Sequence, residues 1–219
     1  MNLSDRALRA LAIHGLDPTS ARGAGWAERR RRARAAATEL DDILGPGQVA
    51  LVTGPSGSGK SMILDSLARR LRGSGRPVIV ADASLVGPCA RRRPLIDLVS
   101  GTIEAALSAL GRAGLGEARV LTLPFQALSD GQRARALLAI ALSRAPAPCT
   151  LLADEFASTL DRTTAFALAR TASRWARASG ARAVLATAHD DILEPLGPDV
   201  LVEQPLDGPA RLLVRRLAA

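Results

Sequence analysis

Lys60 is difficult to explain as ordinary surface charge, because it is the only lysine among the chain's 29 lysines and arginines. An ammonium group is a compact charge, whereas a guanidinium group is a planar fork, so the two are not interchangeable at a binding site. Lys60 lies in GPSGSGKS, which fits G-x-x-x-x-G-K-S, a pattern whose backbone N–H groups cradle phosphates. The residues that we expect to line this phosphate site are Gly54, Pro55, Ser56, Gly57, Ser58, Gly59, Lys60, Ser61 and Met62.

The residues around this phosphate loop (residues 54–61) supply the elements that such a loop requires. QVALVTG before it is a short β-branched run typical of a buried strand, and SMILDSLARRLR after it has the apolar spacing of a helix. A strand and a helix joined by the loop direct its N–H groups and the helix N-terminus at one anion. We expect Lys60 to bridge the terminal phosphates and the hydroxyl of Ser61 to bind Mg²⁺. The alternative is a glycine-rich turn without a ligand.

Two adjacent acids follow a second strand-like run in CTLLADEF. Residues 150–153 suit a buried strand, and Asp154 and Glu155 come directly after it. Adjacent acids at the end of an apolar strand are costly unless a cation or a reaction uses them. We expect Asp154 to hold the Mg²⁺ shell, through water, and Glu155 to orient or deprotonate an attacking water. The alternative is that both acids only begin a loop.

His189 follows a third strand-like run, residues 183–188. In a parallel sheet the carboxyl ends of the strands meet at one edge, so His189 is expected beside Asp154 and the phosphate loop. A histidine at that edge can contact a γ-phosphate. Ordinary packing is the alternative.

LSDGQ, residues 128–132, begins an apolar helix rich in arginine. The N-terminus of a helix carries unpaired N–H groups and a partial positive charge, so Ser129 and Gly131 make a seat for an anion. Ser and Asp are also the preferred N-cap residues, so Ser129 or Asp130 has an equally good structural role. These residues alone leave both roles open.

Taken in order, the phosphate loop, LSDGQ, the strand with Asp-Glu, ASTLD and the strand ending in histidine resemble the ATP-binding-cassette ATPases over residues 45–191. The resemblance implies ATP and Mg²⁺ as cofactors and a head-to-tail homodimer with composite sites. It implies that Ser129, Gly131 and Gln132 act on ATP held by the partner copy. Residues 158–161 resemble the loop that joins the two sites, and Asp161 is counted with the nucleotide-binding residues.

Several details differ from the family pattern or narrow it. Asp130 replaces a glycine and brings a carboxylate near phosphate, which an outward-turned side chain would relieve. ELDDIL, LSDGQ, ADEFASTLDR, AHDDILEPLGPDV and RPLIDLV resemble a soluble cassette-ATPase group that is sometimes fused to an acetyltransferase-like domain. No glutamine occurs from residue 51 to 125, where transporter cassettes carry one that faces the membrane partner, which disfavours such a partner. Trp26 is the only candidate for the aromatic residue that the family places under adenine, although the segment after it reads as a helix.

Composition limits the remaining choices. The chain has 219 residues, is 47% hydrophobic and has no apolar run near eighteen residues, so we expect one domain that does not span a membrane. No export signal is visible, so the cytoplasm is the expected location. The two cysteines show neither metal-ligand spacing nor a disulfide framework. The net charge of +8 has two clusters, residues 29–34 and 91–93, which a solvated face or a nucleic-acid partner would explain.

These observations predict an α/β fold of the P-loop NTPase class, with a parallel-centred sheet and a small helical subdomain over about 85–145. Residues 1–40 are expected to form a basic helical extension and residues 41–219 the ATPase domain. The leading function is an ATPase that closes as a dimer on MgATP. The alternatives are the nucleotide-binding subunit of a transporter, which the missing glutamine disfavours, and an ATP-controlled nucleic-acid-binding module. The last segment, ARLLVRRLA, is read as a strand or a short helix.

Overall fold

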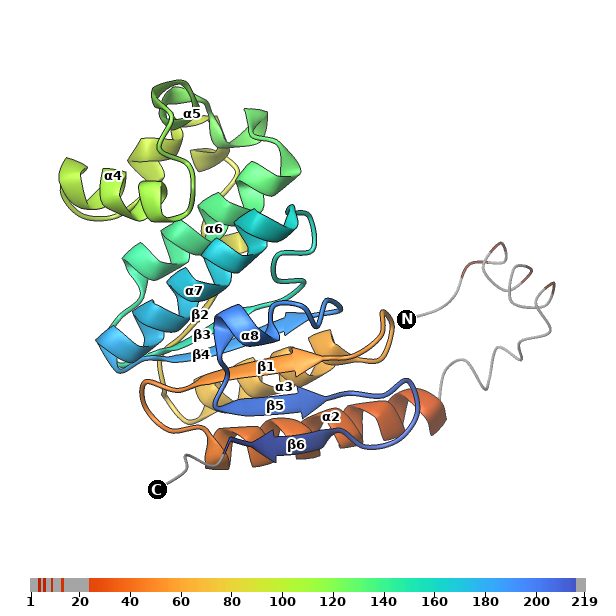
Figure 1. Cartoon of the computed structure of the whole chain (residues 1–219). Coiled ribbons are helices and arrows are strands. Elements are labelled where there is room, and N and C mark those ends of the chain that lie inside the picture. The colour runs from red at the N-terminus through yellow and green to blue at the C-terminus, as the bar shows by residue number, and fades with distance from the viewer. Residues whose placement is uncertain (1–3, 5, 7–8, 10–12, 14–23, 216–219) are drawn as a thin grey trace.

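The computed structural model describes residues 4, 6, 9, 13 and 24–215. Its centre is a six-stranded sheet in the order β2-β3-β4-β1-β5-β6 (Figure 1). The strands are β1 (Val49–Thr53), β2 (Val78–Val80), β3 (Thr150–Ala153), β4 (Arg182–Thr187), β5 (Val200–Glu203) and β6 (Arg211–Val214). The β5–β6 pair is antiparallel and the other pairs are parallel. The predicted fold class is therefore confirmed, and residues 211–214 of the last segment form the strand β6.

Helices cover both faces of the sheet, which explains why its central strands, such as β1 and β3, are almost entirely apolar. Val49 and Leu51 of β1 pack in the same cluster as residues of α6 (Asp130–Arg144) and α7 (Arg162–Ser179). Ala50 and Val52 pack on the opposite face with α2 (Ala24–Ile43) and α3 (Lys60–Gly73). All four side chains are fully buried, so β1 lies at the centre of a three-layer core.

The segment between β2 and β3 is a helical layer that stands beyond one end of the sheet (Figure 1). It ends in α6, whose buried residues tie it to the core. Its other elements are η2 (Ala83–Leu85), η3 (Ala90–Arg92), η4 (Leu95–Leu98), α4 (Ile103–Arg112), α5 (Ala118–Thr122) and η5 (Phe125–Ala127). A short helix, α8 (Leu193–Leu196), lies between β4 and β5. Within the described residues, no helix has both the length and the apolar character needed to cross a membrane.

Helix α2 runs parallel to α3, with its N-terminal part beside the start of α3 and its C-terminal end fixed by Asp41. Its stripe of small apolar residues is buried against α3 and the sheet. The Asp41 side chain, which is only 2% exposed, receives hydrogen bonds from Arg70 at 2.7 Å, Arg76 at 2.5 Å and Arg182 at 3.0 Å. The expected division after residue 40 falls inside this helix, and most of residues 1–23 lie outside the described part, so the separate extension stays a prediction.

Candidate functional site

The strand order brings three of the predicted site segments to one edge of the sheet. β3, β4 and β1 are neighbours, with Ala153 opposite Leu185 and Thr53 opposite Thr187. Because the three strands are parallel, the segments that follow them leave the sheet in the same direction. The phosphate loop follows β1, residues 154–161 follow β3 and His189 follows β4.

The phosphate loop begins with a close backbone approach that only glycine permits. Gly54 has φ 147°, and a Cβ there would lie 2.1 Å from the carbonyl oxygen of Gln204. Gln204 follows β5, is buried, and its backbone N–H donates to the Thr53 carbonyl at 2.8 Å. The end of β5, the strand next to β1, therefore braces the loop. The motif contains no signal for this contact, because the partner lies 150 residues away along the chain.

Lys60 is held inside the loop by loop carbonyls. It is 9% exposed, and its Nζ donates to the carbonyl of Gly54 at 2.8 Å and of Pro55 at 2.9 Å. An ammonium group has three N–H donors, and two of them bond these carbonyls. The third is available for an anion, and the other two become available if Lys60 moves away from the carbonyls. Gly59, with φ 105°, is the N-cap of α3 and makes no side-chain cap hydrogen bond, which leaves the first N–H groups of the helix directed at the loop.

Asp154 and Glu155 are both exposed, so the burial cost that the sequence analysis attached to them does not arise. What distinguishes this turn is the backbone at Glu155 and Ala157. Glu155 has φ 46° and Ala157 has φ 60°, in the left-handed region that residues other than glycine rarely adopt. Such strain costs about 1–3 kcal/mol per residue and persists only when the surroundings impose it. Here the Phe156 N–H donates to the Ala186 carbonyl at 2.7 Å and ties the turn to β4.

His189 is exposed and lies two residues after the end of β4. Its backbone N–H donates at 3.1 Å to the hydroxyl of Thr187, which is fully buried. The backbone is therefore anchored, while the imidazole is exposed beside the segments that follow β1 and β3.

Ser129 is the N-cap of α6. Its hydroxyl accepts from the Gln132 N–H at 3.2 Å, and the Gln132 side chain accepts from the Ser129 N–H at 3.0 Å, which completes a capping box. The structural role left open by the sequence is therefore present. Ser129 is also exposed, and a Cβ at Gly131 would lie 3.2 Å from Leu160 and 3.4 Å from Thr159, so the loop after β3 crosses close to the helix start.

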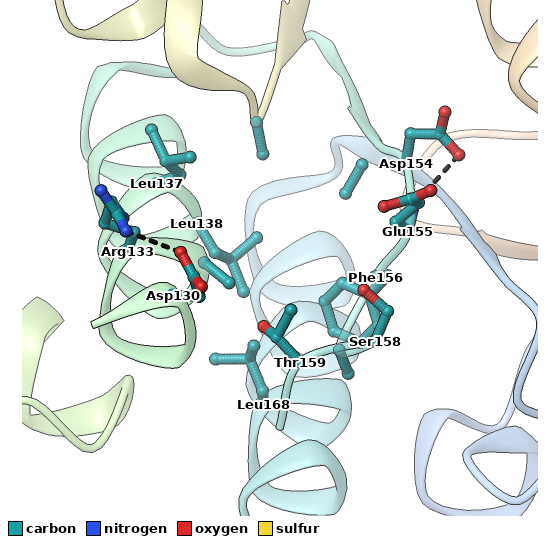
Figure 2. A pocket seen from close by; sticks show the side chains of 14 residues that line it. Asp130, Arg133, Leu137, Leu138, Asp154, Glu155, Phe156, Ser158, Thr159 and Leu168 are labelled. Carbon is teal, nitrogen blue, oxygen red and sulfur yellow. Dashed lines mark hydrogen bonds and ion pairs between the residues drawn. The ribbon is translucent and has the colours of Figure 1, made fainter. Parts of the chain in front are cut away.

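A cavity of about 280 Å³ separates the start of α6 from the segment after β3 (Figure 2). Asp130 and Arg133 line it on one side, and Asp154, Glu155 and Ser158 line it on the other. The Asp130 carboxylate accepts from Arg133 at 2.6 Å. The carboxylate that replaces the family's glycine is thus neutralised within its own helix, and its side chain is 79% exposed.

Asp161 is committed to the start of α7. Its two carboxylate oxygens accept from the Thr164 backbone at 2.9 Å and from the Thr164 hydroxyl at 2.6 Å. These hydrogen bonds hold the pKa of Asp161 below its usual range. A direct role of Asp161 in nucleotide binding remains a prediction, whereas Ser158 and Thr159, just before it, are exposed.

Trp26 lies on α2, on the side of the sheet that carries the phosphate-loop helix. It is 56% exposed and is part of the helix that the sequence indicates there. Arg29 and Arg32, one and two turns further on, line a cleft together with residues of the phosphate loop. The sequence analysis noted these arginines only as part of a basic run, because the packing of α2 on α3 cannot be read from charge alone.

A glycine-rich phosphate loop between the central strand and the next helix, with acids at the end of a neighbouring parallel strand, defines a P-loop nucleotide-binding protein. No family model matches the chain. The chain is 34% identical over 186 residues to the cytochrome c biogenesis ATP-binding export protein CcmA of Rhodospirillum rubrum, a match that covers 75% of this chain and 78% of the relative. The chain belongs to the ATP-binding-cassette ATPases.

Other matches are shorter or concern the fold. The chain is 33% identical over 119 residues to the zinc import ATP-binding protein ZnuC of Magnetococcus marinus, covering 49% of this chain and 45% of the relative. Two solved dimeric structures of the ATP-binding cassette MJ0796, one of them in a post-hydrolysis state with ADP and Pi, match with TM-scores of 0.60 and 0.61. They are 21% and 20% identical and each match covers 80% of this chain and 89% of the cassette, so they support the fold.

Proposed function

We propose that this ATPase hydrolyses MgATP in two composite sites between two copies of the chain arranged head to tail. The observation that carries the proposal is the meeting of the phosphate loop, Asp154–Glu155 and His189 at one edge of the sheet. Each group has a separate task there, and the predicted LSDGQ contribution comes from the second copy. The dimeric MJ0796 structures, which share the fold, support this arrangement.

The phosphate loop binds and positions the phosphate chain. Its N–H groups and the N-terminus of α3 surround the anion, and Lys60 moves from the carbonyls of Gly54 and Pro55 to the terminal phosphates. The side chains present fit Mg²⁺, which prefers oxygen ligands and is usually bound by only one or two protein groups. Here the Ser61 hydroxyl would coordinate the ion directly, and the Asp154 carboxylate would hold it through water. The ion would neutralise charge that develops on the phosphate oxygens.

Glu155 orients the attacking water and accepts its proton as the water oxygen bonds to the γ-phosphorus and the bond from that phosphorus to the bridging oxygen breaks, which releases ADP and phosphate. The left-handed backbone at Glu155 directs this turn away from a regular helix or strand path, a form of strain that is often found at functional sites. His189 contacts the γ-phosphate from the neighbouring strand end. Once a second copy covers this edge, bulk solvent would reach the water held between Glu155 and the γ-phosphate from one side only.

The second copy supplies Ser129, Gly131 and Gln132. The start of α6 is exposed and presents a helix N-terminus with a hydroxyl, which is suited to an anion. The loop that packs on Gly131 also carries Ser158 and continues to Asp161, so it connects the two half-sites of one chain. The Asp130–Arg133 pair keeps the extra carboxylate from repelling the partner's nucleotide.

A mixing experiment tests this assignment, because only a composite site can be repaired by another chain. Lys60→Ala removes the phosphate-loop charge, and Ser129→Asp keeps a good N-cap while it places a negative charge against the phosphate. Each variant alone is expected to be inactive. In a mixed dimer one site combines both changes and the other combines neither.

With random pairing of equal amounts, half of the dimers contain one intact site of two, so turnover per chain is expected near one quarter of the wild-type value. ATP turnover is measured for the mixture and for each variant at the same total protein. Exchange of differently labelled chains, followed by fluorescence transfer, verifies that mixed dimers form. No gain in a mixture that contains them would contradict a contribution of Ser129 to the partner's site.

A second candidate function is the energising subunit of a transporter. The specific observation that favours it is the named role of two relatives, an export protein and a zinc import protein. The missing glutamine between residues 51 and 125 disfavours it, and motifs such as ADEFASTLDR and AHDDILEPLGPDV resemble instead the soluble group that is sometimes fused to an acetyltransferase-like domain. Recovery of a tagged Glu155→Gln chain with ATP distinguishes them: a membrane protein that copurifies stoichiometrically supports the transporter role, and a partner without membrane spans supports the other.

A further inference from the structure

One side of α2 is buried in the C-terminal half of the helix, and the same side becomes exposed towards the N-terminus. Ala33, Ala37 and Leu40 are at most 5% exposed and pack with α3 and the sheet. Arg29 and Trp26 precede Ala33 by four and seven residues, which places them on the same side of the helix. Both are exposed. At 1.5 Å per residue, Trp26 lies about 10 Å further along the helix than Ala33.

This half of α2 lies beside the phosphate loop. A cleft of about 30 Å³ joins α2, the loop, the first turn of α3 and the turn between β5 and β6. The turn lies close to the N-terminal part of α2 (Figure 1). The lining residues are Arg29, Arg32, Ala33, Ser58, Gly59, Met62, Gln204, Leu206, Asp207 and Gly208.

The charges around the cleft are unbalanced. Arg32 is paired with Glu28 at 2.7 Å. Arg29 takes part in no ion pair among the described residues, and it lines the cleft together with Gly59, the N-cap of α3, where the helix carries a partial positive charge. Asp207 is the single carboxylate in the lining. Cations at a helix N-terminus repel its dipole, so this arrangement is favourable only when an anion lies between them.

A second observation also indicates a ligand. Ser58 is 6% exposed, lines this cleft, and its hydroxyl oxygen is a buried side-chain atom without a hydrogen-bond partner. Buried polar groups in folded proteins are nearly always paired, and an exception in a binding loop indicates a missing ligand or water. The orphan hydroxyl lies on the phosphate-loop side of the cleft and Arg29 lies on the α2 side.

We propose that Arg29 is a nucleotide ligand that reaches the phosphate chain from outside the phosphate loop. The proposal rests on the proposed function, in which the loop binds ATP. α2 thus acts as an arm, fixed at one end by Asp41 and carrying a cation at the other. Arginine suits this task because its fork donates two parallel hydrogen bonds to phosphate oxygens.

Calorimetric titration with ATP and with inorganic tripolyphosphate tests the proposal, with full-length chains that carry Glu155→Gln to stop turnover. Arg29→Ala is expected to weaken both ligands by a similar factor of about ten or more, the usual value of a hydrogen-bonded charge pair. Arg34→Ala is the matched control, because Arg34 lies on the same helix, is exposed, and is absent from the cleft lining. It is expected to change either affinity less than twofold. Circular dichroism verifies that α2 stays folded in both variants.

Two results would overturn the proposal. If Arg29→Ala leaves both affinities unchanged, Arg29 is not a ligand. If it weakens ATP and leaves tripolyphosphate unchanged, Arg29 contacts the nucleoside and not the phosphates. Lys60→Ala, measured in parallel, separates failure of the underlying function: if this variant binds both ligands normally, the phosphate loop is not the site, whatever Arg29 does.

Discussion

Asp41 is predicted to contribute a measurable part of the stability of the α2 packing, and the effect is predicted to depend on pH. Burial would raise the pKa of this carboxyl, but hydrogen bonds from Arg76, Arg70 and Arg182 outweigh burial and lower the pKa from 3.8 to about 2. One pKa unit corresponds to about 1.4 kcal/mol, so the lowered pKa amounts to about 2 kcal/mol of folding free energy at neutral pH.

The sign of the pH dependence follows from the direction of the shift. Because the folded pKa lies below the unfolded value, the contribution is complete above about pH 4 and disappears as the pH falls through about 2. Asp41→Asn preserves the shape of the side chain but not its charge. It is expected to lower the unfolding free energy by about 2 kcal/mol at pH 7, and this difference from the wild type is expected to shrink between pH 4 and pH 2.

A larger loss is expected for Asp41→Ala. The Arg182 side chain is only 13% exposed, so removal of its partner leaves a charge in a poorly hydrated place, which costs about 3–5 kcal/mol. Asp42→Asn is the matched control. Asp42 is the next residue, is 62% exposed and contacts Arg70 at 3.2 Å, so its exposed pair is expected to contribute less than about 1 kcal/mol.

Urea unfolding followed by circular dichroism, at pH 7 and at steps down to pH 3, measures these differences. The reasoning is refuted if Asp41→Asn and Asp42→Asn cost the same at pH 7. It is also refuted if the Asp41→Asn difference does not decrease as the pH falls below 4.

Three further predictions concern the site. Lys60→Arg is expected to abolish ATP turnover and nucleotide-dependent thermal stabilisation, because a planar fork cannot occupy the position of the ammonium; wild-type turnover would contradict this. Glu155→Gln is expected to bind MgATP but hydrolyse it at least about 100-fold more slowly, and to elute as a dimer with ATP in size-exclusion chromatography with light scattering; undiminished turnover by a monomer would reject the role. Gly54→Ala is expected to cost more than about 3 kcal/mol in urea unfolding, because its Cβ would meet the Gln204 carbonyl at 2.1 Å, whereas Gly57→Ala, with nothing within 4 Å, is expected to cost about 1–2 kcal/mol; equal costs would disprove the packing argument.

The sequence alone predicted those parts of the molecule that depend on local pattern. The apolar run at 150–153 is β3, and the run at 183–188 matches β4 to within one residue at each end, because strands buried on both faces are apolar throughout. The glycine spacing of the phosphate loop defines its backbone. The parallel order then places the strand ends at one edge without further information.

Contacts between distant segments were beyond the sequence analysis. Nothing near Asp41 in the sequence indicates that three arginines 29 to 141 residues away would surround it. The same is true of Gln204, which braces Gly54, and of Arg29, which was one of several arginines in a basic run. The burial argument for Asp154 and Glu155 failed for a related reason, because an apolar strand does not reveal whether the residues after it emerge into solvent.

Ser129 was given two roles by the sequence, and the chemistry of a hydroxyl allows both at once. As an N-cap its oxygen accepts from the Gln132 N–H, which uses one of its two lone pairs. Its O–H donor is not used in that bond, and an anion seated on the helix N-terminus is an acceptor. In the capping box the Gln132 side-chain oxygen accepts from the Ser129 N–H, so the Gln132 side-chain NH₂ group takes no part in that hydrogen bond. The cap therefore fixes the position of two donors at the start of α6, so the structural role prepares the proposed contact with the partner's ATP.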